Sequence, residues 1–263
     1  MPGNPCKIIA LANTRSKNSS TLLTSLGKDS CRKLGTLISV LLLLGNSSVA
    51  TAEDPVLKPF TAHYASTWDL GLAIKGEATR QLVQLENGEW QLSLQASALI
   101  AKLNEQSRIR IQEDQLQPLS YQYQRKVLNR NKELSIAFDW QQGQAITTSG
   151  DRWSMPITPP LQDKLSVQLQ LRKDLSHRPS GHFTYEVAAG GQIETFHYQV
   201  QGEEQLNLTL GQYHTIKVER LRTGTNDRET LIWFAPELNY QVVRIQQIEP
   251  DGKSYQLDLQ SIE

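Results

Sequence analysis

The side chains in this chain that could bind a metal are its five histidines, and their spacing defines no metal site. They are His63, His177, His182, His197 and His214. A metal site needs three or four ligands that converge at about 2 Å, and nothing in this spacing enforces such convergence. We expect His177 and His182 to flank a turn and to approach His197 across adjacent strands. The sequence therefore predicts ordinary strand and surface histidines and no bound metal.

Adjacent carboxylates could share the roles of general acid and general base, and two such pairs occur, Glu113-Asp114 and Glu203-Glu204. Both pairs lie in predicted turns, so we interpret them as solvated turn residues. Asp163 is interpreted as a helix cap and Ser166 as a helix-surface or supporting residue. The chain has no Gly-x-Ser-x-Gly elbow, no His-Glu-x-x-His pair and no glycine-rich phosphate loop. We therefore predict no catalytic residue, no cofactor and no enzymatic activity, with a hydrolase as an alternative that no motif supports.

Arginines and aromatic residues offer chemistry for binding. Arg220, Arg228 and Arg244 fall on predicted strands, where Glu219 and Glu229 would serve as cross-strand partners. The alternative for these arginines is a site for an anionic head group.

The aromatic residues recur on or beside the predicted strands, at Trp68, Trp90, Trp140, Trp153, Trp233, Tyr64, Tyr121, Tyr123 and Phe138. An ordinary β core uses such residues freely, and this is the simpler interpretation. The alternative is an apolar groove between a sheet and a helix, since pockets form in such gaps. The residues predicted to bind a ligand in this groove are Tyr64, Trp90, Tyr121, Tyr123, Leu165, Leu169, Trp233 and Arg244.

One stretch, at about 161–175, is predicted to be the helix that positions these groups. Its apolar residues alternate as in a strand, at Leu165, Val167, Leu169 and Leu171. Its other residues are mostly good helix formers, and Val167 is its one β-branched residue. Asp163 is placed to cap the first turn. Because the helix would be apolar on two sides, we expect it to be buried on two sides.

The rest of the chain from residue 60 reads as one strand after another. Strands are predicted at 60–70, 74–85, 90–98, 108–112, 119–125 and 133–139, and after the helix at 182–188, 192–201, 205–210, 213–222, 228–234, 242–248 and 254–261. Residues 99–103 fit either one helical turn or the start of a strand, and Asn87-Gly88 is a strong hairpin signal. Short strands at regular spacing indicate antiparallel pairing. The predicted fold is mainly β, a strongly curved antiparallel sheet or open barrel that wraps one central helix.

Residues 1–52 are predicted to be a secretory signal peptide with an N-terminal extension. A basic stretch, 28–33, precedes a short apolar run, 34–44, which is followed by small residues. Cleavage is expected near Ala50 or Ala52. The alternative is an uncleaved membrane anchor, for which the apolar run is short. Residues 1–27 are either a disordered extension or lie upstream of the true start.

Charge and cysteine usage agree with export. Six of the 27 basic residues but only one of the 27 acidic residues precede Glu53, which leaves 21 basic against 26 acidic residues. A mildly acidic body argues against a nucleic-acid partner. Both cysteines, Cys6 and Cys31, lie in the predicted leader, so the mature chain would have no disulfide and no thiolate. We expect 53–263 to be a single β domain, periplasmic and not membrane-spanning after cleavage.

Three stretches of the second half carry a resemblance to a known family. They are Gln162-Asp163-Lys164-Leu165-Ser166 with Leu171-Arg172, Gly211-Gln212-Tyr213-His214-Thr215 with its continuation to Arg220, and Leu231-Ile232-Trp233-Phe234-Ala235-Pro236 with the later Val243-Arg244-Ile245. In this order they resemble the DUF3108 family of exported bacterial proteins, whose function is unknown, from about Phe60 to the C-terminus. The chain departs from the family at Gln241-Val242, where Leu-Pro is common. The resemblance implies a strongly curved antiparallel β protein and assigns no catalytic residue.

These observations predict a non-enzymatic protein of the cell envelope. Its expected partner is an apolar small molecule or a lipid, held in the groove between sheet and helix. The alternative is a structural or protein-interaction module that contacts an envelope protein through a sheet edge or an exposed apolar surface.

Overall fold

The computed structural model describes residues 56–263 except 70, 72, 150–151, 223 and 225–227. These residues belong to one compact unit, Thr51–Glu263. The predicted leader, 1–52, lies outside the described residues. Within the described part of the chain, no helix is both long enough and apolar enough to span a lipid bilayer.

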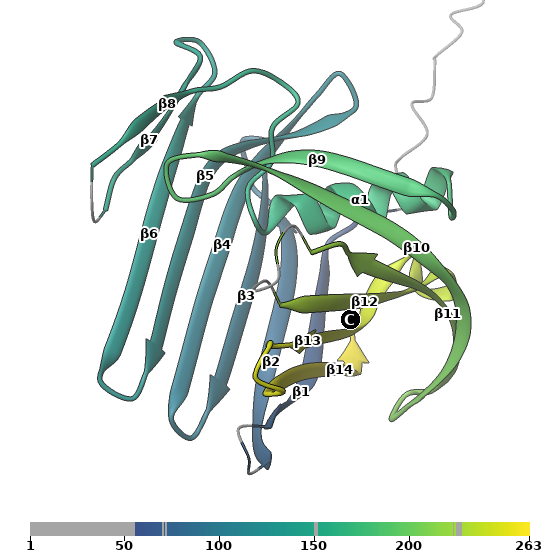
Figure 1. Ribbon diagram of the computed structural model, residues 1–263. Helices are drawn as coiled ribbons and strands as arrows, with labels where there is room; N and C mark the ends of the chain where they lie inside the picture. The colour runs from purple at the N-terminus through teal and green to yellow at the C-terminus, as the bar shows by residue number, and fades with distance from the viewer. Residues whose placement is uncertain (1–55, 70, 72, 150–151, 223, 225–227) are drawn as a thin grey trace, which may run out of the picture. The chain divides into compact units, whose positions relative to one another are not determined.

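The described residues form one large antiparallel sheet with a helix on its concave side (Figure 1). The first half comprises β1 (Phe60–Asp69), β2 (Ala73–Gln84), β3 (Trp90–Ala98), β4 (Ala101–Gln112), β5 (Gln115–Val127), β6 (Arg130–Asp139), β7 (Gln144–Thr147) and β8 (Ser154–Pro156). The helix α1 (Ser166–His177) follows. The second half comprises β9 (His182–Ala188), β10 (Ile193–Leu208), β11 (Gly211–Arg220), β12 (Glu229–Ala235), the short 3-10 helix η1 (Pro236–Leu238), β13 (Gln241–Ile248) and β14 (Ser254–Ile262).

The sheet follows the chain in two runs of neighbouring hairpins, which β1 and β14 join. The strand order is β8-β7-β6-β5-β4-β3-β2-β1-β14-β13-β12-β11-β10-β9. The short strand β8 and the strand β9 are therefore the two edges, and the sheet does not close on itself. The predicted fold class, an open and curved antiparallel sheet around one helix, is confirmed.

The bounds of individual strands agree only in part with those predicted from the sequence. The bounds of β3 and β9 are those predicted, and β4 begins at Ala101, so 99–103 contributes to a strand. A single 16-residue strand, β10, replaces two predicted strands, because Gly202 lies at a bulge within the strand and not in a turn. Glu203 and Glu204 accordingly lie in a strand, and their assignment to a turn was wrong. The short strands β7 and β8 were missed.

The helix begins five residues later than predicted, because the chain before it pairs with a sheet edge. The backbone N–H of Gln162 donates to the carbonyl of Glu186 at 2.9 Å, and its carbonyl accepts from Ala188 at 2.8 Å. Asp163 follows, and its Oδ1 accepts from the N–H groups of Leu165 at 2.8 Å and Ser166 at 2.7 Å. The predicted capping role of Asp163 is thus confirmed.

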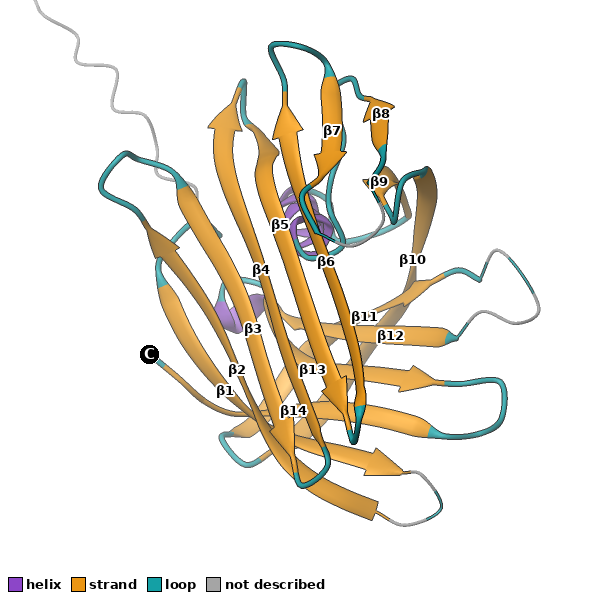
Figure 2. Cartoon of the chain, turned by 90° about the vertical axis from the view of Figure 1, so that its left-hand side faces the viewer, coloured by secondary structure: helices purple, strands orange, loops and turns teal. Residues whose placement is uncertain are grey.

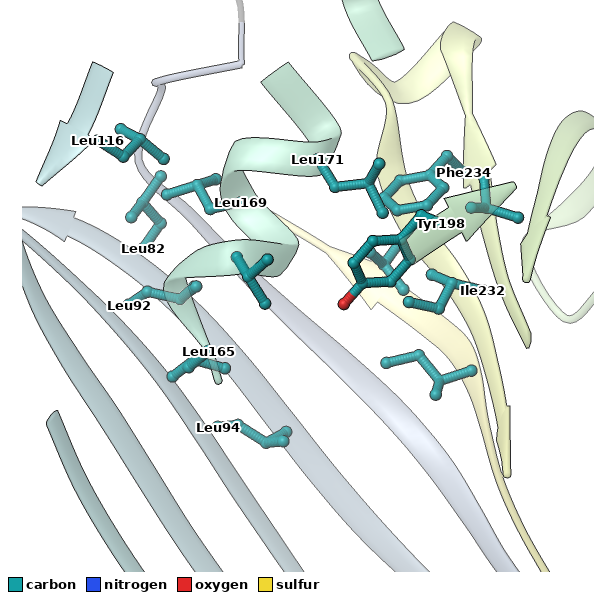
Figure 3. Close-up of a cluster of buried hydrophobic side chains, with 14 of the residues drawn as sticks. Leu82, Leu92, Leu94, Leu116, Leu165, Leu169, Leu171, Tyr198, Ile232 and Phe234 are labelled. Carbon is teal, nitrogen blue, oxygen red and sulfur yellow. The ribbon is translucent and has the colours of Figure 1, made fainter. Parts of the chain in front are cut away.

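Burial of α1 on two sides is also confirmed. Gln170 Oε1 accepts from the N–H of Leu116 in β5 at 3.1 Å, and Asp174 accepts from the hydroxyl of Tyr185 in β9 at 2.6 Å. The helix therefore lies between the two halves of the sheet (Figures 1 and 2). Leu165, Val167, Leu169, Leu171 and Leu175 are all buried. Figure 3 shows Leu169 facing the first half of the sheet, at Leu82, and Leu171 facing the second, at Phe234.

We expect Leu171→Ala to lower the free energy of unfolding by about 2–5 kcal/mol, because it leaves a cavity between α1 and the second half of the sheet. Leu171 is 0% exposed. Urea titration followed by circular dichroism measures this change. The matched control is Leu99→Ala, at a leucine that is 90% exposed, which we expect to stay within about 0.5 kcal/mol of wild type. Equal losses in the two variants would contradict the packing described above.

Candidate functional site

A cavity of about 590 Å³ lies on the concave side of the sheet, beside the first turn of α1. Lys164 and Gln168 line it from the helix end. Apolar side chains line it from both halves of the sheet, among them Leu94, Leu134, Phe196, Ile232, Ile245 and Leu257. Small-molecule sites are typically about 300–1,000 Å³, so this cavity has the size of a ligand site, and its lining is part apolar and part polar.

The two sheet edges approach each other beside this cavity, where Trp153 lies against Gly191. Trp153 immediately precedes β8, and Gly191 lies in the turn between β9 and β10. A Cβ placed on Gly191 would lie 3.1 Å from the Trp153 ring, and the backbone there has φ +94°. A side chain at this position would clash with the indole and would also be strained at this φ, so glycine is needed. The contact bridges the open side of the sheet and places the indole in the cavity wall.

Three buried hydroxyl groups line the cavity without a protein partner. They belong to Ser149, Thr230 and Tyr255. Among the described residues, none of these oxygens has a hydrogen-bond partner. Buried polar groups in proteins are nearly always hydrogen-bonded, and one left unpaired costs about 1–3 kcal/mol. A molecule in the cavity with polar atoms would satisfy them.

A half-buried carboxyl group, that of Glu105, also lines the cavity. Burial raises its pKa to about 7, although a hydrogen bond from the Tyr121 hydroxyl to Oε1, at 2.5 Å, works in the opposite direction. Asp163 lies nearby and is wholly buried. Burial raises the pKa of Asp163 to about 6, against the effect of donors that include the Ser107 hydroxyl at 2.5 Å. The wall of the cavity therefore carries a carboxyl group that is partly protonated at neutral pH.

Basic groups outnumber acidic groups around the cavity. Its lining contains Lys132, Lys164, Arg220 and Arg228 against Glu105 and Glu133. Lys132, Lys164 and Arg228 are exposed and so mark the mouth, whereas the Arg220 guanidinium lies over the Phe196 ring at 4.7 Å. The cavity thus combines apolar and polar side chains inside, and its lining contains more basic than acidic groups.

Of the eight residues predicted to bind a ligand, the structure brings Tyr121 and Tyr123 to this cavity. Leu165 and Leu169 are buried in the core beside it, as is Trp90. The hydroxyl of Tyr64 donates to the carbonyl of Val242 at 2.7 Å, also within the core. Whether any of these residues binds a ligand stays a prediction.

Trp233 and Arg244 lie on the opposite, convex face of the sheet. They face each other across β12 and β13, whereas their neighbours Ile232 and Ile245 line the cavity. Side chains alternate between the two faces of a strand, so the two sets cannot share a site. Arg244 pairs with Asp258 at 2.5 Å. Trp233 is 4% exposed and lies beneath the ammonium group of Lys217, at 5.1 Å.

Sequence reasoning missed several cavity residues, namely Glu105, Ser149, Thr230, Tyr255 and Leu257. One signal was present for Glu105, because it alternates with Leu103 and Ser107 along β4 and so shares their inward face. No comparable signal marked the three unpaired hydroxyls, since burial of a hydroxyl depends on what packs over it.

Of the three arginines, Arg244 makes a cross-strand ion pair with Asp258, and the two glutamates also contact other groups. Glu229 pairs with Arg222 at 3.7 Å, and Glu219 accepts a hydrogen bond from Gln201 at 2.6 Å. Arg228 pairs with Glu249 at 3.5 Å. Ion pairs across strands depend on register and on side-chain reach.

The histidine interpretation is confirmed for His182 and His197, which lie on adjacent strands with ring centroids 6.2 Å apart. Their Nδ1 atoms contact Gln199 and Thr184 at 2.6 and 3.2 Å. Within the described ranges, no group of three or more histidine, cysteine or acidic side chains is placed to hold a metal ion.

A second cavity, of about 720 Å³, lies at the other end of α1. Among its charged groups, Lys173 pairs with Asp114 at 2.8 Å, and Asp174 accepts a hydrogen bond from the Tyr185 hydroxyl at 2.6 Å. Because these groups already have partners, the first cavity is the stronger candidate for a ligand site.

Comparisons with known proteins support the fold. The model of the family described as "Protein of unknown function (DUF3108)" matches residues 60–260. No curated protein matches the chain. A β-barrel-like protein of the DUF1849 domain from Brucella abortus is similar, with a TM-score of 0.54, 9% identity and coverage of 79% of this chain and 98% of that one.

Two more distant structures were also found. One is the MucA/MucB complex of Pseudomonas aeruginosa, with a TM-score of 0.31, 9% identity and coverage of 80% and 53% of the two chains. The other is a putative outer membrane lipoprotein-sorting protein domain from Vibrio parahaemolyticus, with a TM-score of 0.24, 8% identity and coverage of 79% and 85%. Of these three structures, the Brucella protein is the one similar enough to inform the fold.

The raised pKa of Glu105 leads to a pH-dependent stability. The folded protein holds this proton at pH values where the unfolded chain has lost it, so stability falls as pH rises from about 4.5 to about 7. We expect Glu105→Gln to reduce this fall by about 1–3 kcal/mol, because the amide does not ionise and Glu105 is partly exposed to solvent. Thermal melts across this pH range measure it.

The control is Glu133→Gln, at an exposed carboxylate on β6, which we expect to leave the pH profile unchanged. Asp163 contributes its own loss of stability as pH rises from about 3.8 to about 6. Glu105→Gln retains this loss. If the stability of Glu105→Gln depended on pH as that of the wild type does, Glu105 would ionise in the folded protein as it does in the unfolded chain.

Proposed function

This chain belongs to the DUF3108 family of proteins of unknown function, and we propose that it binds an amphipathic small molecule or lipid. The apolar part would lie in the cavity, and an anionic head group would lie at its basic mouth. The observation that carries this proposal is the set of three buried, unpaired hydroxyls, of Ser149, Thr230 and Tyr255, in a cavity whose lining is part apolar and part polar. They call for a ligand that is mostly apolar but has polar atoms.

The apolar lining favours a hydrocarbon chain. Phe196, Ile232 and Leu257 present carbon surface to the cavity, and burying apolar area contributes about 25 cal/mol per Å². Shape and lining together support a fatty acid or lipid acyl chain.

The charges at the mouth favour an anionic head group. Lys132, Lys164 and Arg228 are exposed there, and guanidinium groups match carboxylate and phosphate oxygens in geometry. Glu105 lies deeper and is partly neutral at pH 7, because burial raises its pKa. Its repulsion of a carboxylate or phosphate is weakened accordingly.

The same residues support binding in preference to catalysis. A hydroxyl acts as a nucleophile when an adjacent base accepts its proton. Over the described ranges, the hydroxyls of Ser149 and Thr230 have no hydrogen-bond partner and hence no such base. We therefore propose a non-enzymatic role, in which the protein carries or senses its ligand.

The predicted leader supports an exported location, and we propose that the mature protein works in the cell envelope, in the periplasm. The competing proposal is an interaction module that pairs with a partner through a sheet edge. Two features weigh against it. The edge strand β8 has only three residues, and Gln162 already pairs with the other edge strand, β9.

Leu103→Trp tests the proposed ligand site by filling the cavity from β4. We expect the affinity for a fluorescent long-chain fatty acid to fall at least about tenfold, which corresponds to about 1.4 kcal/mol. The matched control is Asn104→Trp, the adjacent residue on the opposite face of the strand, where it is exposed. It should bind like the wild type.

The wild-type protein, exported in a bacterial host and purified without detergent, is examined in parallel by native mass spectrometry. A bound amphipathic molecule at one equivalent is the expected result. A clean apo mass together with no uptake of fatty acid would overturn the proposed function. Equal binding by Leu103→Trp would place the ligand elsewhere.

A further inference from the structure

Two hairpin turns at one end of the sheet expose large apolar side chains side by side. Leu99, in the turn between β3 and β4, is 90% exposed, and Leu128, between β5 and β6, is 63% exposed. The N–H of Leu128 donates to the carbonyl of Ile100 at 2.9 Å, which joins the two turns. We refer to Leu99, Ile100 and Leu128 as the leucine tip. Single exposed leucines are common on proteins, but two in adjoining turns form a local apolar projection.

The backbone at Leu128 makes the choice of leucine unusual. Val127 and Arg130 pair across the hairpin, so Leu128 is the first residue of a two-residue turn, and its φ is +52°. Glycine suits such a position and a bulky side chain is strained there. The Leu128 side chain is also mostly outside the core. Leucine at this position therefore contributes little to the fold and is suited to contact with something outside the protein.

Basic residues flank the leucine tip on both faces of the sheet. Lys102 lies opposite Lys126 across β4 and β5, and Arg125 lies opposite Lys132 across β5 and β6. Arg130 follows the second turn, and all five side chains are exposed. Like charges directly opposite each other destabilise a sheet. The arrangement therefore opposes the stability of the sheet and provides a surface that attracts anions.

The leucine tip adjoins the cavity mouth. Leu103, Tyr123, Lys132 and Leu134 line the cavity, and each lies on β4, β5 or β6 a few residues from the two turns. In Figure 1 these turns project at the lower left, away from α1. A partner that contacts the tip would thus lie beside the opening of the cavity.

We propose that the leucine tip and its basic flanks dock the protein on an anionic lipid surface. Leu99 and Leu128 insert among the lipid acyl chains, while the lysines and arginines contact lipid phosphates. A few buried apolar side chains or a basic cluster alone bind membranes weakly, and the two together bind stably. We assign the partner as lipid because exposed leucines and basic residues occur together. Basic residues alone would fit any polyanion. Apart from Lys132, which also lies at the cavity mouth, the docking surface uses residues other than those that define the proposed ligand site.

The test is co-sedimentation of the full chain with lipid vesicles. Wild type is expected to bind vesicles of phosphatidylcholine and phosphatidylglycerol in equal parts at least about tenfold more strongly than vesicles of phosphatidylcholine alone. Added salt should weaken the binding, because screening shortens the range of the charges to roughly 3 Å at 1 M. Binding to neither vesicle, or equal binding to both, would overturn the proposal.

Two variants separate the apolar and the electrostatic contributions. Leu128→Gly removes an inserting side chain while placing a residue that suits the turn, so folding is retained. Lys126→Glu reverses a charge on an exposed site. Each is expected to lower vesicle binding about fivefold or more, in line with losing a buried apolar group or an interfacial charge. Melting temperatures verify that both variants are folded.

The matched controls lie away from the leucine tip, one in the second half of the sheet and one just before β1. Leu210→Ser changes a leucine that is 39% exposed in the turn between β10 and β11, and Lys58→Glu reverses an exposed charge just before β1. Both are expected to bind vesicles like the wild type. Equal losses in the test and control variants would show a general surface effect and overturn the proposed docking site.

The cavity variant Leu103→Trp distinguishes this proposal from the proposed function. It is expected to bind anionic vesicles normally even though it binds fatty acid weakly. Loss of vesicle binding in Leu103→Trp, at a normal melting temperature, would mean that the vesicle signal reports uptake of lipid into the cavity and would overturn docking through the leucine tip.

Discussion

Burial of α1 between the two halves of the sheet is the interaction on which the rest of this structure depends. An open sheet of this size has a concave apolar face that must be covered, and one helix covers much of it. Leu169 packs toward the first half and Leu171 toward the second. Asp163 fixes where the helix starts, because one carboxylate oxygen caps its first turn and the other accepts from Ser107 on β4. The start of the helix is thereby attached to the middle of the sheet.

The cavity follows from this placement. Since α1 begins only at Ser166, after a segment that pairs with β9, the concave space beyond its first turn is left without a helix to fill it. Loops and the side chains of both half-sheets enclose that space. Trp153 against Gly191 bridges the open side without a strand. An open sheet thus acquires a concave cavity without closing into a barrel.

Some of the features that cost stability lie around this cavity and the adjoining turns, while others, such as the unpaired buried hydroxyl of Ser66 and the positive φ of Asp114, lie elsewhere. Those around the cavity and the turns include unpaired buried hydroxyls, a carboxyl group held in a wall that disfavours its charge, a leucine with positive φ, and basic residues opposite one another across strands. Each opposes folding locally. Natural sequences tolerate such conflicts mainly where function requires them. The proposed ligand site and the proposed docking surface lie next to each other in the structure.

Local sequence pattern determined the elements of this protein. Alternation and turn residues were sufficient to predict the bounds of β3 and β9, and Asp163 was recognised as a cap, because these features depend on neighbours along the chain. Tertiary structure decided which side chains meet. Ile232 lines the cavity and Trp233 does not, although both are large and apolar, because the strand places successive residues on opposite faces. The partners of Arg244 and the burial of Tyr255 depended likewise on strands distant in sequence. Register and packing set these contacts, and a single sequence carries no direct record of either.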